Sequence, residues 1–238
     1  MQVVSETEGV RLLAGLGEGG ALLAGPGGAI ELRVDVRSDA AVPGADLLIC
    51  HPHPLHGGTL DNKVVHTLAR AARDAGLRAI RFNFRGVGRS GGVHDRGRGE
   101  VDDLCALVNA IVTASPGRVL LLAGFSFGAY VAASSLERLA SAGQLPRAAL
   151  LVAPPVHYPG FPAMPPFPVP VTVFQGRDDE VVAADAVADW CGLRGLPLQA
   201  FATGHFFHGL LPDLKAATEA WIRDAFPEAG PAGKLPLP

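Results

Sequence analysis

Long apolar runs and clusters of basic residues are both missing from this sequence of 238 residues. The longest apolar stretches, such as Val119–Ala123 and Ala148–Ala153, fall far short of the roughly twenty residues that a helix needs to cross a bilayer. Lys and Arg total 20 against 23 acidic residues, and the formal net charge is −3. Nucleic-acid binding draws on clustered positive charge. We therefore expect neither a membrane span nor a nucleic-acid partner.

Cysteine is scarce, and the N-terminus lacks basic residues. Cys50, Cys105 and Cys191 are an odd number with no close pairing, and each has apolar neighbours. They are expected to be reduced, buried thiols. Residues 1–8 carry acids and no basic region, so no secretory signal is expected. Both features favour a cytoplasmic protein.

What the sequence does contain favours one α/β domain. Its length is short for two ordinary domains, and 48% hydrophobic residues are enough to bury a core. Short apolar runs alternate with amphipathic helical segments, which is typical of a doubly wound, mostly parallel sheet. Strands are expected at Asp46–Cys50, Leu77–Phe84, Val119–Gly124, Ala148–Ala153, Val169–Gln175 and Leu198–Ala202. Helices are expected at Asp61–Ala75 with Asp61 as its cap, Glu100–Ala114, Phe127–Ser141, Val181–Cys191 and Asp213–Phe226.

The ends of the chain and one internal segment depart from this alternation. We assign residues 1–24 to an N-terminal extension of unknown role, residues 25–227 to the domain, and residues 228–238 to a mobile Pro-rich tail. Ile30–Val36 alternates apolar and charged residues like an exposed antiparallel strand. Pro154–Pro170 is too rich in proline to be helical and too short for a helical cap.

The strongest chemical signal is the pentapeptide Gly124-Phe-Ser-Phe-Gly128, which lies between an expected strand and an expected helix. In such a turn a serine takes a strained backbone conformation, and the flanking glycines let neighbouring elements approach. Ser126 would project from the end of the sheet as a nucleophile. The amide of Phe127, at the start of the helix, is placed to donate to an oxyanion.

A serine needs a base to activate it and an acid to orient that base, and in this fold they follow in the order acid, then histidine. Two acids, Asp178 and Asp179, follow an expected strand and compete for the role. The base is expected at His205, directly after a glycine at the exit of the last strand. His208, three residues on, is interpreted as a supporting or surface residue.

A second oxyanion donor should come from the loop His51-Pro-His-Pro-Leu-His-Gly-Gly58. Proline has no amide hydrogen, which leaves the amides of His53 and Leu55, and we favour His53. The three histidines of this loop also suit a metal site, but the alternating prolines should hold their rings in fixed, divergent directions, so stiffening of the loop is the alternative. We expect no metal and no organic cofactor.

Without a cap, the site should be open and should accept a short acyl group or the end of a larger molecule. The side chains expected to line it are Phe125, Phe127, Phe161, Met164, Phe167 and Phe206, with a core position as the alternative for each. Arg85 is expected to support the site by pairing with a carboxylate such as Glu100 or Asp103.

Taken together, these motifs resemble a bacterial family of small α/β-hydrolases without a lid. The resemblance rests on the loop His51–Gly58, the segment Phe82–Ser90, the serine pentapeptide and His205-Phe-Phe-His-Gly209, and it runs from about Gly25 to the last helix. It implies acyl transfer from an ester or thioester to water. The resemblance also favours Asp179 over Asp178 as the acid, because the acid of this family usually stands three residues after the glycine, here Gly176.

The sequence therefore predicts a serine hydrolase that acts on a small-molecule acyl substrate. A peptidase or acyltransferase could use the same three residues. A binding scaffold without activity is the alternative of a different class, because a fold does not fix a function.

Overall fold

The computed structural model describes residues 13, 18–37, 44–161 and 163–227. The strands are β1 (Gly19–Gly25), β2 (Gly28–Asp35), β3 (Ala45–Cys50), β4 (Arg78–Phe82), β5 (Val119–Phe125), β6 (Ala148–Val152), β7 (Val171–Gly176) and β8 (Leu198–Phe201). The helices are the 3₁₀ turn η1 (Pro54–His56) and α2 (Lys63–Asp74), α3 (Arg98–Ala114), α4 (Phe127–Ser141), α5 (Ala184–Arg194) and α6 (Leu211–Ala225). Most of residues 1–24 and all of residues 228–238, where the sequence predicts an extension and a tail, lie outside the described residues.

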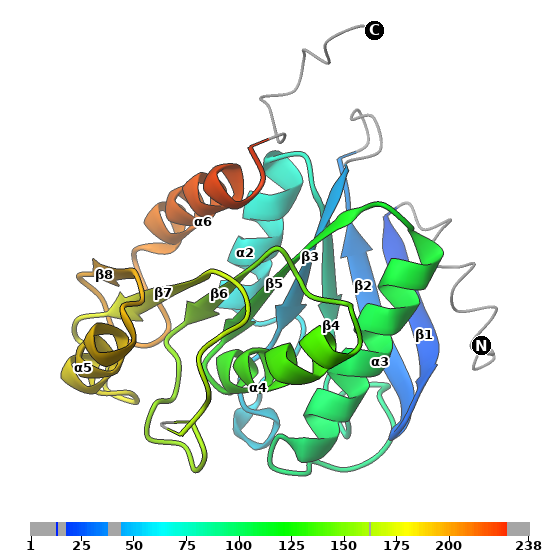
Figure 1. Ribbon diagram of the computed structural model, residues 1–238, viewed down its shortest axis with the longest axis horizontal. Coiled ribbons are helices and arrows are strands. Elements are labelled where there is room, and N and C mark those ends of the chain that lie inside the picture. Colours follow the sequence, from blue (N-terminus) through cyan, green and yellow to red (C-terminus); the bar gives the residue numbers. More distant parts are fainter. Residues whose placement is uncertain (1–12, 14–17, 38–43, 162, 228–238) are drawn as a thin grey trace, which may run out of the picture.

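The eight strands form one sheet in the order β1-β2-β4-β3-β5-β6-β7-β8 (Figure 1). The six strands β4, β3, β5, β6, β7 and β8 follow one another in the sheet, and each is parallel to its neighbours in this series. Strand β2 pairs antiparallel with both β1 and β4. The expected mostly parallel α/β fold is therefore confirmed, as is the antiparallel strand near Ile30–Val36. Residues 19–24, which the sequence analysis assigns to an extension, belong to β1.

Helices cover both faces of the sheet (Figure 1). Alternate residues of the central strand β5 point into two separate cores: Leu120 and Leu122 into one, Leu121 and Ala123 into the other. The first core is closed by α3, α4 and α5, and the second by α2 and α6. This burial on both faces explains why the central strands are continuous apolar runs.

Two helices begin later than the sequence predicts, because polar side chains hold the residues before them. Asn62, and not Asp61, caps α2, since its side chain accepts hydrogen bonds from the amides of Val64 and Val65. The helix expected from Val181 begins at Ala184. Side-chain hydrogen bonds of this kind compete locally with helix formation.

No cap covers the carboxyl end of the sheet in the described part of the segment between β6 and β7, where residues 153–161 and 163–170 form neither helix nor strand. None of the helices that the structure describes is long and apolar enough to cross a membrane.

Candidate active site

The serine pentapeptide forms a sharp turn between β5 and α4. Ser126 has φ 55° and ψ −121°, a region that side-chain-bearing residues seldom adopt. Its amide donates to the carbonyl of Val152 at the end of β6 (2.8 Å), which fixes the turn to the sheet. The hydroxyl therefore stands at the amino end of a helix, at the carboxyl edge of the parallel strands.

The two glycines of the pentapeptide are required by close backbone contacts. A Cβ at Gly124 would lie 2.3 Å from the carbonyl oxygen of Gly128. A Cβ at Gly128 would lie 2.3 Å from the carbonyl oxygen of Cys50 and 2.5 Å from that of His51. The turn thus packs directly against the exit of β3, which carries the loop of the expected oxyanion donor.

The structure brings Ser126, His205 and Asp179 into one hydrogen-bonded series. The Nε2 of His205 lies 3.0 Å from the Oγ of Ser126, and its Nδ1 lies 2.8 Å from the Oδ2 of Asp179. Because an ionised carboxylate can only accept, Nδ1 carries the proton and Nε2 is free to accept one from the serine. His205 is 2% exposed, so its ring is shielded from bulk water on most sides.

Asp179 is held as an anion by four donors. Its Oδ1 accepts the amides of Val181 (2.8 Å) and Val182 (2.7 Å), and its Oδ2 accepts from His205 and from the Nε2 of Gln175 (2.9 Å). Burial by itself would raise the pKa of the Asp179 carboxyl, but the hydrogen bonds from His205 and the two amides outweigh it and hold the pKa below its usual value.

The other two acids of this turn do not reach the histidine ring. Asp178 is exposed to solvent. Glu180 is also exposed, and its Oε2 accepts the backbone amide of His205 (3.2 Å), which ties the turn after β7 to the turn after β8. The geometry therefore separates Asp179 from its neighbours, as the family resemblance favours.

Gln175 is a residue that the sequence analysis overlooks. It is buried at the end of β7, and its amide nitrogen donates to Asp179 and to the carbonyl of Val182 (3.1 Å). The available signal was a polar residue near the end of an otherwise apolar strand, six residues before the pair Val181-Val182. Its contacts fix the carboxylate that faces His205.

Two backbone amides near Ser126 are open to a ligand oxygen. Among the residues that the structure describes, the amides of Phe127 and His53 have no hydrogen-bond acceptor. The amide of Leu55, the alternative donor, is occupied by the Nδ1 of His53 (3.2 Å). The rings of His53 and Phe127 lie 4.8 Å apart, so the loop after β3 and the start of α4 meet beside the serine.

His51 fixes the first part of that loop. It is fully buried, its Nδ1 lies 2.6 Å from the carbonyl oxygen of Pro52, and its Nε2 accepts the amide of Phe84 (2.9 Å). Burial lowers the pKa of His51 to about 4, so the ring is neutral at pH 7. Since both nitrogens are engaged, this histidine is not available to a metal, and no metal-binding group of three ligands occurs in the described ranges.

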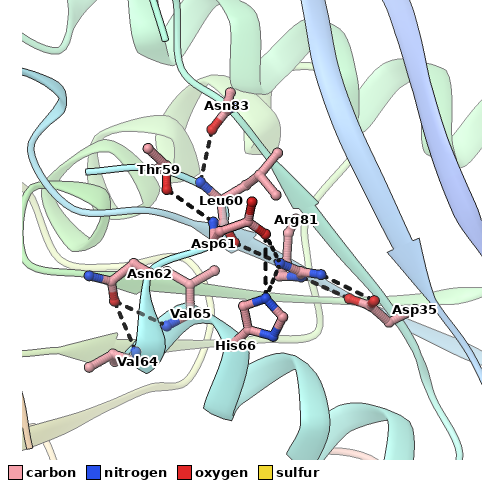
Figure 2. A network of polar contacts seen from close by, with 10 residues as sticks. All are labelled: Asp35, Thr59, Leu60, Asp61, Asn62, Val64, Val65, His66, Arg81 and Asn83. Atoms are coloured by element: carbon pink, nitrogen blue, oxygen red, sulfur yellow. Dashed lines mark hydrogen bonds and ion pairs between the residues drawn. The ribbon is translucent and has the colours of Figure 1, made fainter. Parts of the chain in front are cut away.

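Arg81 and Asn83 fix the far end of the same loop (Figure 2). Arg81 is 1% exposed and donates to the carbonyl of Leu60 (2.8 Å), while Asn83 accepts the amide of Leu60 (2.8 Å). Arg81 also forms a bidentate ion pair with Asp35 and contacts Asp61 (3.1 Å). The loop from β3 to α2 is thus anchored at both ends by buried polar groups.

The supporting residues named from the sequence have different surroundings. Arg85 forms a bidentate pair with Asp103 (2.8 and 2.9 Å), one of its two expected partners, and this pair joins the loop after β4 to α3. His208 is exposed, and its ring lies 5.9 Å from that of Phe206.

Two of the six side chains expected to line the pocket contact the ring of His205, whereas Phe127 contacts the ring of His53 instead. Phe125 is buried 5.0 Å from the ring of His205, and Phe206, 40% exposed, lies 5.1 Å from it. Phe161 is buried against Trp190 and Tyr130. Met164 and Phe167 line a cavity of about 360 Å³ beside α4.

Comparison with known proteins agrees with this architecture. Residues 47–237 match the alpha/beta hydrolase family. A Rickettsia prowazekii protein described as uncharacterised is 38% identical over 170 residues, which are 69% of this chain and 68% of that protein.

Two solved structures have the same fold over most of their length. One, from Xanthomonas campestris, is described as an α/β serine hydrolase without a lid; its TM-score is 0.79 at 39% identity, covering 87% of this chain and 94% of that one. The other, described as an α-β serine hydrolase homologue from Coxiella burnetii, has a TM-score of 0.79 at 38% identity, covering 87% and 98%. The chain therefore belongs to the alpha/beta hydrolase family.

Proposed function

We propose that this protein is a serine hydrolase that cleaves ester or thioester bonds of small or open-ended acyl substrates. The observation that carries the proposal is the series Ser126 Oγ, His205 Nε2 and Nδ1, and Asp179 Oδ2, with separations of 3.0 and 2.8 Å. A strained serine at a helix amino end, with a base and an acid in line, is the arrangement that nucleophilic acyl transfer requires.

In the first half of the reaction, His205 takes the proton of the Ser126 hydroxyl as the oxygen attacks the carbonyl carbon. The carbonyl π electrons move onto the carbonyl oxygen, which the amides of Phe127 and His53 stabilise. Asp179 stabilises the imidazolium. The tetrahedral intermediate then expels the alcohol or thiol, which leaves with the proton from His205.

In the second half, a water molecule gives a proton to His205 and attacks the acyl-enzyme. The collapse of the second tetrahedral intermediate returns the proton to Ser126 and releases the acid. The steps balance without a redox partner. The absence of a cap suits a substrate whose far end extends into solvent.

The proposal includes a cytoplasmic location and a small-molecule substrate. The three cysteines are free, with Cys50 and Cys191 buried and Cys105 partly buried, which supports a reducing, cytoplasmic setting. The partner is a small-molecule acyl substrate.

The test is a substrate panel on wild type and on the variants Ser126→Ala and His205→Gln. The panel contains p-nitrophenyl butyrate, butyryl-CoA and butyryl p-nitroanilide. We expect turnover of the ester or thioester that falls by a factor of at least about 10³ in both variants. Preferential turnover of the anilide would favour a peptidase, and ester cleavage only in the presence of an added amine would favour an acyltransferase. Retention of full esterase activity in either variant would contradict the proposal.

A further inference from the structure

A second imidazole–carboxylate pair lies close to the serine turn and has no part in the mechanism above. The Nδ1 of His94 lies 2.9 Å from the Oε1 of Glu100, whose side chain is completely buried. This repeats the arrangement of His205 and Asp179, in which a buried carboxylate also holds Nδ1. In both pairs the carboxylate engages Nδ1, so Nε2 is the nitrogen that can interact with another group.

This second pair is part of an imidazole cluster formed by His53, His56 and His94. The ring of His53 lies 4.5 Å from that of His56 and 4.9 Å from that of His94. His53 and His94 both pack on Phe127, at 4.8 and 5.4 Å. His205 packs on Phe125 instead, so the two histidine groups contact the residues on opposite sides of Ser126 in the chain.

In the rings of His94 and His53, Nδ1 has a hydrogen-bond partner within the protein, whereas Nε2 has none among the described residues. Glu100 also accepts the amides of Asp95 and Gly97, so its bond to His94 has a structural role in the turn before α3. The Nδ1 of His53 accepts the amide of Leu55, which leaves the proton of this ring on Nε2. Within the described part of the chain, neither Nε2 has a hydrogen-bond partner.

Charged residues of both signs lie around the cluster. The nearest carboxylate, Glu100, is buried and already accepts three hydrogen bonds. Arg96, two residues after His94 in the chain, is exposed. Burial raises the pKa of the Tyr158 hydroxyl, and the positive charge of Arg96 opposes this rise. The ring of Tyr158 packs 5.8 Å from that of Phe127. Burial, together with His56 and His94, lowers the pKa of His53, and a bound anion would oppose that effect.

The donors present suit a carboxylate better than a phosphate. Two or three imidazole N–H groups can satisfy a single negative charge on two oxygens. Phosphate recognition in proteins relies more on guanidinium groups, with their several N–H donors. Among the described residues, the cation–ring contacts are those of Arg147 with Phe226 and of Arg194 with Phe167 and Trp190, and none of them is with Phe127, on which the cluster packs.

We infer that the imidazole cluster is a substrate subsite that binds a carboxylate group carried by the ester, beside the oxyanion amides of Phe127 and His53. This inference rests on the proposed function and narrows it to esters of acidic molecules. His94 and His53 would determine specificity by donating from Nε2.

Two pairs of p-nitrophenyl or phenyl esters test this inference. The two esters of the first pair differ at the end of the acyl chain, which is a methyl group in one and a carboxylate in the other. The two esters of the second pair differ in the alcohol part, which carries a carboxylate in one and no charged group in the other. Wild type is expected to favour the carboxylated member of at least one pair by about tenfold or more in kcat/KM, as expected for a hydrogen bond to a charged group. His94→Leu should remove the preference, which is a ratio between two esters and therefore does not depend on the overall activity of the variant.

Controls separate this inference from the proposed function. His157→Ala changes an exposed histidine with no ring contact to the cluster, and it should keep the preference. His56→Ala, at an exposed position of the cluster, provides a second variant if His94→Leu fails to fold, and it should reduce the preference. Hydrolysis of the neutral esters with no preference in either pair would overturn the subsite alone, whereas no hydrolysis of any ester would overturn the proposed function.

Discussion

The position of Asp179 shows how a single side chain can be selected among adjacent acids. Asp178, Asp179 and Glu180 are consecutive in the sequence, yet only Asp179 has its carboxylate enclosed by two amides, Gln175 and His205. The lowered pKa of this carboxyl follows from those donors. At neutral pH it is therefore ionised, as an orienting acid must be.

Replacing this carboxylate should affect the reaction far more than the fold. Asp179→Asn places an amide against Nδ1 of His205 and disfavours the tautomer that accepts the serine proton. We expect kcat for p-nitrophenyl butyrate to fall by roughly four orders of magnitude. Asp178→Asn, at the exposed neighbouring position, is the matched control and should keep kcat within about twofold. The reverse pattern would reassign the acid.

A buried neutral histidine should make stability depend on pH. The pKa of His51 is about 4 in the folded protein, against 6.5 when unfolded, so the unfolded state binds a proton more readily between these values. His51 therefore contributes no penalty above pH 6.5, and its penalty grows as the pH falls to about 4. The loss amounts to about 3 kcal/mol in the free energy of unfolding.

Denaturant titrations at pH 7 and pH 4 measure this effect. His51→Gln removes the titrating group, so its free energy of unfolding should decrease less between the two pH values than that of wild type. An equal decrease in the two proteins would show that His51 does not titrate as described.

Ser126, Asp179 and His205 could all be predicted from the sequence, because each follows a recognisable strand. The role of Gln175 and the contact of His94 with Glu100 could not be predicted, because these side chains meet their partners only in the folded protein. Four of the six expected pocket residues contact other side chains, or line a cavity that His205 does not border, for the same reason: Phe127, Phe161, Met164 and Phe167.

At the scale of elements, the turn at Ser126 depends on how closely β3, β5 and α4 approach. Gly128→Ala would force its methyl group against the carbonyl oxygens of Cys50 and His51. We expect a loss of roughly 1–3 kcal/mol in the free energy of unfolding, or failure to fold, because backbone atoms must move. Gly192→Ala in α5 meets nothing within 4 Å and should stabilise by about 0.5–1 kcal/mol. Thermal unfolding of the two variants compares them, and equal stability would contradict this account.

The boundaries of most elements could be predicted from the sequence, and the exceptions have local causes. Central strands such as β5 are buried on both faces, so they can be recognised in the sequence as continuous apolar runs. The start of α5 was missed because the amides of Val181 and Val182 bind Asp179 instead of beginning a helix. The order of the strands required the structure, as no single run reveals its neighbours.

At the scale of the whole molecule, the lack of a cap should be visible in kinetics. Because the described part of residues 153–170 forms no helix, there is no lid to open before a substrate binds. The rate on a short-chain ester should rise hyperbolically with concentration, without a jump as the ester passes its solubility limit. A sigmoidal rise at that limit would indicate a moving cover over the site.

The most direct test of the central claim is to find which residue a fluorophosphonate modifies. After reaction with the intact protein, peptide mass spectrometry should place one phosphonyl group on Ser126, with none on Ser126→Ala and slow labelling of His205→Gln. Absence of labelling in wild type, or labelling that persists in Ser126→Ala, would contradict the account.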